Sequence, residues 1–357
     1  MEMYKSPETH PESNPADYYR NPERLRQDDI QQAVFCDTIE QLKVSDIGLL
    51  PDFSEETDHR GGRRSATAVR SALDATGAQA MLTPQLYDNF AERELSFAPD
   101  PLLRIGKEDS RRQIFFGEMT ANSLEHGETQ HTSVAVSTIP SEKDVNKHGQ
   151  SLHEISMYQC AASLDIPSLE VLGVVVTDAH PDMYGFVLTK YDPDISTIDT
   201  LDWSNMSQKE VTETLAYAVD TLALLHTNYL FHGDSAFRNI AVKDSIQKPI
   251  VVDLELSGSL RQETENIMKL SRFMSADFSS LAMSLDQNIS RFYQNDSGLP
   301  SSTDRFDFMH NHIFLPYQDR LIQHGVTPLD PLGLAYDNVV SRRLDEAVGD
   351  EGRWRHV

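Results

Sequence analysis

Three polar side chains near residue 240 stand beside two apolar runs, and their order constrains the fold more than any other feature of the chain. A His-Gly-Asp motif ends at Asp234, Asn239 follows five residues later, and Asp253 comes directly after the apolar run at 249–252. Apolar residues also follow Asn239 at 240–242, so the sequence predicts two short strands joined by a turn. One carboxylate, one amide and a second carboxylate are therefore expected at strand ends on either side of one hairpin.

This set of side chains matches the needs of phosphoryl transfer from ATP. In that reaction a carboxylate orients or deprotonates the acceptor hydroxyl, while an amide and a second carboxylate hold Mg²⁺ on the phosphates. Oxygen donors are the ligands that Mg²⁺ prefers, usually one or two carboxylates together with phosphate oxygens. An isolated Asp or Asn is typical of a turn, so the prediction depends on the joint pattern.

The stretch 223–257 resembles the catalytic and metal-binding loops of the protein-kinase-like superfamily. Its His-Gly-Asp motif is most similar to the atypical and small-molecule branches, such as the aminoglycoside and choline kinases. The resemblance implies a phosphotransferase that uses ATP and Mg²⁺, with Asp234 as catalytic base and with Asn239 and Asp253 as metal ligands. Arg238 is then expected to contact the transferred phosphoryl group or the acceptor, because a guanidinium suits phosphate geometry. An ordinary surface-loop arginine is the alternative.

A second motif follows the hairpin. Asp277 begins the run Asp-Phe-Ser-Ser-Leu-Ala, which resembles a helix start of protein kinases whose Asp braces the backbone of the catalytic loop. A carboxylate at an ordinary helix N-terminus is the other interpretation. His232 matches a position that is largely structural in the family, so we expect a packed and hydrogen-bonded core histidine.

The apolar pattern changes along the chain in the order expected of two unlike lobes. Strands are predicted at residues 102–105, 113–116, 133–136, 171–176 and 185–190, and a helix is predicted at 151–164. Beyond residue 205 the chain is predicted to be mainly helical, beginning with 209–228. Three strands, one helix and two more strands are the order of a kinase small lobe. The resemblance thus implies an α+β, two-lobed protein kinase-like fold, with a small antiparallel sheet lobe and a larger, mainly helical lobe.

Three segments follow from this pattern. Residues 1–95 are expected to form an N-terminal extension, partly disordered because its first 30 residues are polar and hold four prolines, with short helices at 31–50 and within 65–95. Residues 96–192 are expected to be the kinase-like N-lobe. Residues 193–357 are expected to be the kinase-like helical C-lobe.

The small lobe departs from the family pattern where the phosphates of ATP bind. Glu154 falls where the family's helix Glu belongs, and that Glu normally pairs with a strand Lys that holds the α- and β-phosphates. Ser137 stands in place of that Lys, so a solvated helix face is the alternative for Glu154. The loop at 107–110 lacks the repeated glycines that bring backbone N–H groups close to phosphate. Lys190 and Tyr191 fall at the expected hinge, where adenine would dock against backbone groups.

Three functions stay open at this point. The first is an active, atypical kinase whose acceptor is a protein side chain or a small molecule with a hydroxyl group. The second is a pseudokinase, a nucleotide-binding or scaffolding module without turnover, which Ser137 and the glycine-poor loop favour. The third is a hydrolase or another metal enzyme on a different fold, because Asp/Asn/Asp sets bind Mg²⁺ elsewhere too.

Charge and composition argue against several partners. The chain has 31 Lys and Arg against 56 Asp and Glu, a net charge of −25, which disfavours nucleic acid or an anionic membrane as the main partner. The N-terminus lacks the apolar region of a signal peptide, and no apolar run approaches the roughly 20 residues that span a bilayer. We therefore expect a cytoplasmic protein without membrane insertion. Cys36 and Cys160 have no metal-ligand spacing, so neither a zinc site nor a disulfide framework is expected.

Overall fold

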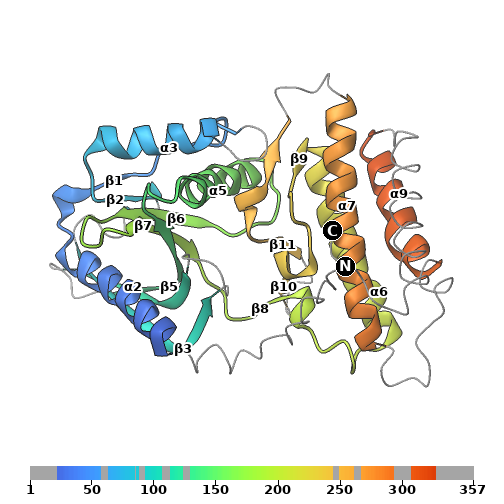
Figure 1. The fold of residues 1–357 in the computed structure, drawn as a ribbon, viewed down its shortest axis with the longest axis horizontal. Helices are drawn as coiled ribbons and strands as arrows, with labels where there is room; N and C mark the ends of the chain where they lie inside the picture. Colours follow the sequence, from blue (N-terminus) through green and yellow to red (C-terminus); the bar gives the residue numbers. More distant parts are fainter. Residues whose placement is uncertain are drawn as a thin grey trace, which may run out of the picture. The chain divides into compact units, whose positions relative to one another are not determined.

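The computed structural model describes residues 22–57, 63–84, 86–87, 93–106, 113–123, 129–243, 249–260, 267–292 and 307–326. These residues form a mixed α and β structure, shown in Figure 1. The chain divides into two compact units, each with its own hydrophobic core. The first unit takes residues 1–50, 76–148 and 172–191, and the second takes residues 51–75, 149–171 and 192–357. Residues 1–30 were predicted to be largely disordered. This is wrong for residues 22–30, which lie in a helix (Pro22–Gln41), and residues 1–21 lie outside the described residues.

A seven-stranded sheet forms the first unit, in the order β1-β2-β6-β7-β5-β4-β3. Its strands are β1 (Ile47–Leu49), β2 (Ala80–Leu82), β3 (Arg93–Gly106), β4 (Gln113–Ser123), β5 (Thr129–Pro140), β6 (Val171–Val176) and β7 (Met183–Lys190). β1 and β2 pair in parallel, whereas β2–β6, β3–β4, β4–β5 and β5–β7 pair antiparallel. All five strands predicted before residue 191 lie within β3 to β7, so this part of the prediction is confirmed.

Two of the seven strands come from the range that the sequence analysis assigned to an N-terminal extension. β1 and β2 have three residues each, too few to show the alternation that identifies a strand. The helical spacing predicted within 65–95, broken near Gly77 and Pro84, is confirmed for α3 (Arg63–Thr76). It is wrong at β2 and at the start of β3. The helix predicted at 31–50 is α2 (Pro22–Gln41), which starts earlier and is followed by a 3₁₀ turn (Val44–Asp46) and by β1.

Helix α2 packs on the sheet through Phe35, which is fully buried. The Phe35 ring makes edge-to-face contacts with Phe97, Phe115 and Phe186, at centroid distances of 5.0, 5.5 and 5.0 Å. Because side chains alternate across a strand, these phenylalanines of β3, β4 and β7 share the face that α2 covers (Figure 1). Each such aromatic pair contributes about 0.5–1.5 kcal/mol beyond the area it buries. α2 is therefore part of the core of the first unit.

The second unit is mainly helical, as the sequence predicts. It holds most of α3 and of α5 (Val145–Ser163), then α6 (Gln208–Thr227), α7 (Ile267–Phe292), a π-helical turn (His310–Phe314) and α9 (Leu315–Gln323). Two small sheets lie among the helices, one of β8 (Ile195–Thr197), β10 (Ile240–Lys243) and β11 (Pro249–Val251), the other of β9 (Leu230–Phe231) and β12 (Gly258–Ser259). The helices predicted at 151–164 and 209–228 correspond to α5 and α6. No helix among the described residues has the length and apolar character needed to cross a lipid bilayer.

Helix α6 begins with a capping box and ends beside the predicted catalytic loop. Ser207 Oγ accepts a hydrogen bond from the Glu210 N–H at 3.3 Å, and Glu210 Oε2 accepts one from the Ser207 N–H at 2.7 Å. These bonds to Ser207 hold the pKa of the Glu210 carboxyl below its usual value. The apolar face of α6 is buried with side chains of α7 and α9 in the core of the second unit. This packing fixes the place of His226, in the last turn of α6.

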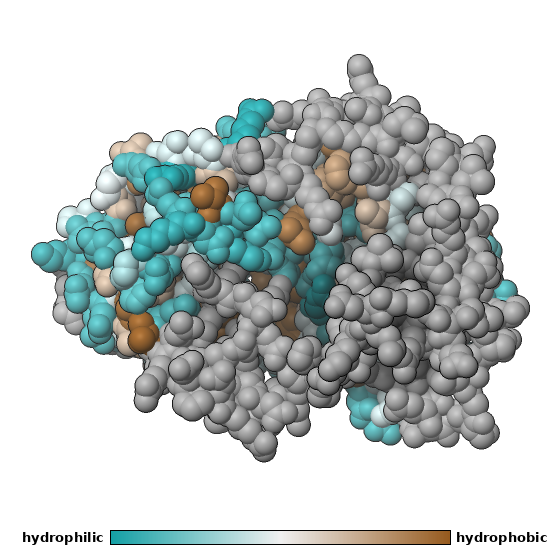
Figure 2. All heavy atoms as spheres, viewed as in Figure 1, coloured by the Kyte–Doolittle hydropathy of each residue, from teal (hydrophilic) through white to brown (hydrophobic). Residues whose placement is uncertain are grey.

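Among the residues coloured in Figure 2, hydrophilic ones predominate on the visible face. Exposed large hydrophobic side chains in the described ranges are Ile30, Leu49, Val145, Met283, Leu315 and Ile322. They are distributed over five elements, α2, β1, α5, α7 and α9. Single apolar side chains of this kind are ordinary on a folded surface.

Substituting Gly185 in β7 tests the close packing of β7 against β6. A Cβ at this position would lie 2.1 Å from the carbonyl oxygen of Val175, so the two strands would have to separate. We expect Gly185→Ala to lower the free energy of unfolding by about 1–3 kcal/mol, measured by urea denaturation.

Gly149 in α5 provides the matched control, since no described heavy atom of another element lies within 4 Å of the place of its Cβ. Gly149→Ala should raise the free energy of unfolding by about 0.5–1 kcal/mol through helix propensity. Effects of the same sign for the two alanines would contradict this account of the packing.

Candidate functional site

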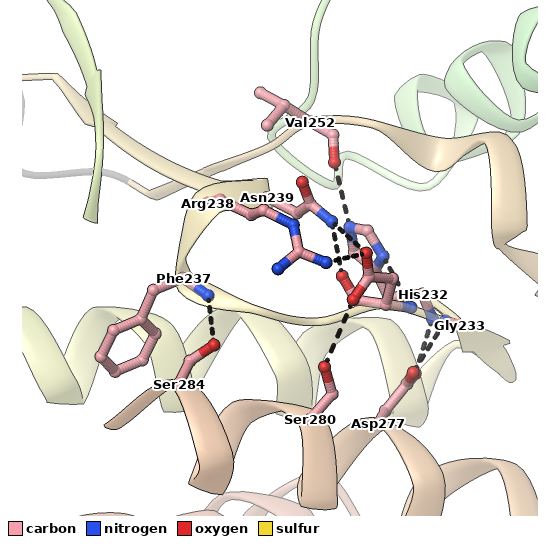
Figure 3. A network of polar contacts seen from close by, with 10 residues as sticks. His232, Gly233, Phe237, Arg238, Asn239, Val252, Asp277, Ser280 and Ser284 are labelled. Carbon is pink, nitrogen blue, oxygen red and sulfur yellow. Dashed lines mark hydrogen bonds and ion pairs between the residues drawn. The ribbon is translucent and has the colours of Figure 1, made fainter. Parts of the chain in front are cut away.

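The loop between β9 and β10 carries the first group of predicted site residues, and Figure 3 shows its polar contacts. His232 follows β9 directly, and a 3₁₀ turn (Phe237–Asn239) leads into β10. Gly233 has a φ of +80°, and a Cβ there would lie 2.1 Å from the carbonyl oxygen of Leu256. The backbone path of the loop therefore requires glycine in the His-Gly-Asp motif.

The buried carboxylate of Asp277 holds the start of this loop. Asp277 Oδ2 accepts a hydrogen bond from the His232 N–H at 2.6 Å, and Oδ1 accepts one from the Gly233 N–H at 2.7 Å. The backbone oxygen of Asp277 also accepts a hydrogen bond from the Ser235 hydroxyl. The expectation that Asp277 braces the loop backbone is confirmed by these bonds. The expectation of a helix start is wrong, because α7 begins ten residues earlier, at Ile267.

A chain of hydrogen bonds ties Asp277 to two further helices. His226 Nε2 lies 3.1 Å from Asp277 Oδ2, and His226 Nδ1 lies 2.5 Å from the Tyr317 hydroxyl. Because a carboxylate oxygen accepts, His226 donates through Nε2, and in the neutral ring Nδ1 is then the acceptor of the Tyr317 hydroxyl. Burial, together with the nearby Asp277 carboxylate, raises the pKa of Tyr317 well above a tyrosine's usual value. The tyrosine is therefore neutral and able to donate.

Asp234 lies at the centre of the loop, and three side chains donate to its carboxylate. Oδ2 accepts from Arg238 Nη2 at 2.7 Å and from Asn239 Nδ2 at 3.1 Å, and Oδ1 lies 3.4 Å from the Ser280 hydroxyl. The Asp234 side chain is 25% exposed, and that of Arg238 is 56% exposed. The carboxylate is thus fixed in orientation while it stays within reach of solvent, which is what a base for an external hydroxyl needs.

Asn239 is buried, and its amide nitrogen faces the loop. Nδ2 donates to the backbone oxygen of Asp234 at 2.7 Å and to the Asp234 carboxylate. The amide oxygen points away from these two acceptors (Figure 3). An oxygen in this orientation is an acceptor or a hard metal ligand.

Asp253 follows β11 in the left-handed backbone region, with φ and ψ both at 60°. β10 and β11 pair antiparallel with Ile240 opposite Val251, so Asn239 and Asp253 come from the same end of one hairpin. The predicted hairpin is confirmed by this register. A non-glycine residue at positive φ costs about 1–3 kcal/mol and persists only where its surroundings determine it, as is frequent at functional sites.

Val252, the residue before Asp253, is held by two hydrogen bonds to the loop between β9 and β10. The Val252 N–H donates to the backbone oxygen of Asn239 at 3.1 Å, and His232 Nε2 donates to the Val252 oxygen at 3.0 Å. His232 is thus the buried, hydrogen-bonded histidine that the sequence predicts. These bonds connect the two loops that carry Asp234 and Asp253.

The Asn239 amide oxygen and the Asp253 carboxylate suit a metal ion that takes most of its ligands from a bound molecule and water. Within the described ranges, no group of three or more His, Cys, Asp and Glu side chains is arranged to hold a metal ion. An amide oxygen and one carboxylate from one end of a hairpin are compatible with Mg²⁺, which commonly uses one or two carboxylates and completes its shell with phosphate oxygens and water.

The residues predicted to contact the nucleotide belong to separate elements. Glu154 lies in α5 with 5% exposure, so the alternative of a solvated helix face is wrong. Ser137 lies in β5 opposite Val187 of β7 and is buried as well. Lys190 ends β7, and the Tyr191 ring packs on Phe116 at a centroid distance of 4.5 Å. The glycine-poor loop at 107–110 lies outside the described residues.

Sequence reasoning missed two serines of α7 that support the loop. Ser280 contacts the Asp234 carboxylate, and Ser284 Oγ accepts a hydrogen bond from the Phe237 N–H at 3.2 Å. They follow Asp277 by three and seven residues, the spacing of one helix face (Figure 3). That spacing was visible in the sequence, but only Asp277 was assigned a contact.

Comparisons with known proteins add little to this geometry. No protein-family model matches the chain, and no curated protein matches it. Among solved structures, the chain is similar to "WaaP in complex with acyl carrier protein", with a TM-score of 0.37 and 13% sequence identity over 67% of this chain and 87% of that one. A likeness of this size supports no conclusion about activity or substrate.

Replacing Asp277 tests whether one carboxylate supports the loop. In Asp277→Asn the side chain loses one acceptor oxygen, so a buried N–H is left without its bond, and we expect a loss of about 1–3 kcal/mol in the free energy of unfolding. Tyr317→Phe removes only the bond to His226 and should cost about 1 kcal/mol. Tyr217→Phe, on the half-buried part of α6, is the control and should change stability by less than about 0.5 kcal/mol. Urea denaturation measures all three.

The raised pKa of Tyr317 predicts a pH dependence of stability. The unfolded chain releases the tyrosine proton at a pH near 10, whereas the folded chain retains it to higher pH. The contribution of Tyr317 is therefore fully present below pH 10 and is lost as the pH rises toward the folded pKa. We expect the stability difference between the wild type and Tyr317→Phe to shrink above pH 10, by at most about 1.4 kcal/mol per pH unit. A difference that stays constant from pH 8 to 11 would contradict this.

Proposed function

We propose that this chain is a kinase-like phosphotransferase that moves the γ-phosphoryl group of ATP to a hydroxyl of a protein or small molecule. The observation that carries the proposal is the arrangement of two loops. Arg238 and Asn239 orient Asp234 in the first loop. Asp253, in the second loop, lies at the same end of the β10–β11 hairpin as Asn239. In this proposal the fold is a two-lobed protein kinase-like fold, with 96–192 as N-lobe, 193–357 as C-lobe and 1–95 as an extension whose α2, β1 and β2 join the sheet and core of the first unit.

Asp234 is the proposed catalytic base. Its carboxylate would accept the proton of the acceptor hydroxyl as that oxygen attacks phosphorus, a role that contributes typically about 10²–10⁴-fold in rate. Arg238 has further N–H groups besides the one that donates to Asp234, and these would contact the acceptor or the transferred phosphoryl group. The large exposed fraction of Arg238 supports this role, because an incoming acceptor can reach it.

Asn239 and Asp253 are the proposed ligands of Mg²⁺. The ion would neutralise charge on the phosphate oxygens. The chain's own contribution is to hold the amide oxygen of Asn239 and the strained backbone of Asp253 in place. Glu154, Lys190 and Tyr191 are the proposed contacts to the nucleotide.

A pseudokinase is the second candidate, and Ser137 favours it. This buried serine of β5 stands where the resemblance expects the strand Lys. Loss of one such electrostatic contact costs a few kcal/mol of transition-state stabilisation, by analogy with the loss of one oriented donor. Nucleotide binding without turnover would be the result if no other cation compensates.

Binding of Mg-ATP is the first test, by thermal unfolding with and without the nucleotide. A ligand at 100 times its dissociation constant stabilises the folded state by about 2.7 kcal/mol. We expect this stabilisation to need Mg²⁺ and to be lost in Asp253→Asn. Asp165→Asn is the matched control, since Asp165 is an exposed Asp with a φ of 55°, close to the 60° of Asp253. Loss of binding in both variants, or no binding by the wild type at millimolar Mg-ATP, would overturn the nucleotide site.

Turnover is tested separately, by release of ADP in the presence of a panel of hydroxyl compounds and peptides. We expect Asp234→Asn to lower kcat by about 10²–10⁴-fold while Mg-ATP still stabilises the protein. Stabilisation by Mg-ATP in the wild type with no ADP release on any acceptor would favour the pseudokinase.

A further inference from the structure

Helix α5 holds both ends of the short segment that begins at Asp253. At the first end, the Asp253 N–H donates to the Tyr158 hydroxyl at 2.9 Å. At the other end, His153 Nε2 lies 2.9 Å from the backbone oxygen of Ser257. His153 and Tyr158 are five residues apart on α5, about 7.5 Å along the helix axis. Both are almost completely buried.

The segment between these two contacts is short and internally bonded. Residues Leu254–Leu256 form a single 3₁₀ turn, and the Ser257 N–H and hydroxyl both donate to the Leu254 oxygen. A displacement of Ser257 would therefore be transmitted through one turn to Asp253. This couples the contact of His153 to the backbone of Asp253.

Helix α3 fixes the histidine that makes the second contact. Ser65 Oγ lies 2.6 Å from His153 Nδ1, and both residues are fully buried. A carbonyl oxygen can only accept, so His153 must carry a hydrogen on Nε2 to donate to Ser257. In the neutral ring, Nδ1 is then the acceptor, and the Ser65 hydroxyl donates to it. The Ser257 oxygen thus requires this tautomer, and the Ser65 hydroxyl, which donates to Nδ1, fixes the orientation of the ring.

We propose that Ser65, His153 and Tyr158 are positioning residues that hold Asp253 in its left-handed conformation. The strained backbone of Asp253 is bonded on one side to the catalytic loop, through Val252, and on the other side to α5. A non-glycine residue keeps a positive φ only where contacts with its surroundings hold that conformation, and these hydrogen bonds are such contacts. α3 is accordingly part of the site, although it lies far before the catalytic loop in the chain. We call these hydrogen bonds, Ser65 to His153, His153 to the Ser257 oxygen and the Asp253 N–H to Tyr158, the clamp. The consequence for metal binding rests on the proposed function, whereas the clamp does not.

Hydrogen exchange of the folded protein, followed by mass spectrometry, tests the clamp itself. We expect Ser65→Ala to speed exchange in peptides that cover 252–258 by about fivefold, the effect of losing one hydrogen bond. Tyr158→Phe removes the acceptor of the Asp253 N–H and should act on the same peptides. Ser71→Ala, an exposed position of α3, is the matched control and should leave exchange at 252–258 unchanged.

Two exchange results would overturn the clamp. One is unchanged exchange at 252–258 in both Ser65→Ala and Tyr158→Phe. The other is a uniform rise that includes α6 and α9, because this would indicate a general loss of stability.

The Mg²⁺ concentration needed for half of the Mg-ATP stabilisation tests the consequence for the site. We expect Ser65→Ala to raise this Mg²⁺ concentration about threefold to tenfold relative to Ser71→Ala. This is less than the roughly 10–100-fold loss seen when a direct outer-shell partner of a metal ligand is removed, because Ser65 acts through His153. Faster exchange with an unchanged Mg²⁺ requirement would contradict the positioning role. Absence of Mg-ATP binding in the wild type would instead remove the proposed function, and the exchange result would still decide the clamp.

Discussion

The buried carboxylate of Asp277 is the interaction on which the candidate site depends. Removing a carboxylate from water is costly unless its oxygens are bonded, and here they accept two backbone N–H groups and a histidine N–H. The bonds in turn satisfy donors of the tightly bent loop that presents Asp234. His226 and Tyr317 extend the chain to α6 and α9, so three helices determine the place of one loop.

Asp253 is held by hydrogen bonds to its own backbone and to that of Val252, whereas Asp277 is held through its carboxylate. The Asp253 backbone is strained, and the strain is maintained by neighbours on both sides, the loop of Asp234 through Val252 and α5 through Tyr158. The two loops are therefore joined by backbone bonds as well as by the β10–β11 hairpin. Such a connection suits a site in which a base and a metal ligand must keep a constant relation, since catalysis falls steeply when reacting groups are misplaced.

Several features could be predicted because their signals are local. The hairpin was predicted from two apolar runs and a turn, and the strands from β3 to β7 from their own apolar residues. The sheet's outer strands β1 and β2 were missed, because three residues show no period and their place depends on partners such as β6. The position of Asp277 inside α7 was also missed, because the motif resembles a helix start while the residues before it continue the helix.

The sequence by itself determined which reactive groups this protein carries and in what order: Asp234, then Asn239, then Asp253 behind a predicted strand. Neighbouring residues suffice for that, since turns and short strands follow from local composition. Only the tertiary structure decided what holds these groups. Ser65 and His153 are 88 residues apart, and Tyr158 and the Asp253 N–H are 95 residues apart. No local pattern marks such pairs, because their contact exists only after the helices have packed.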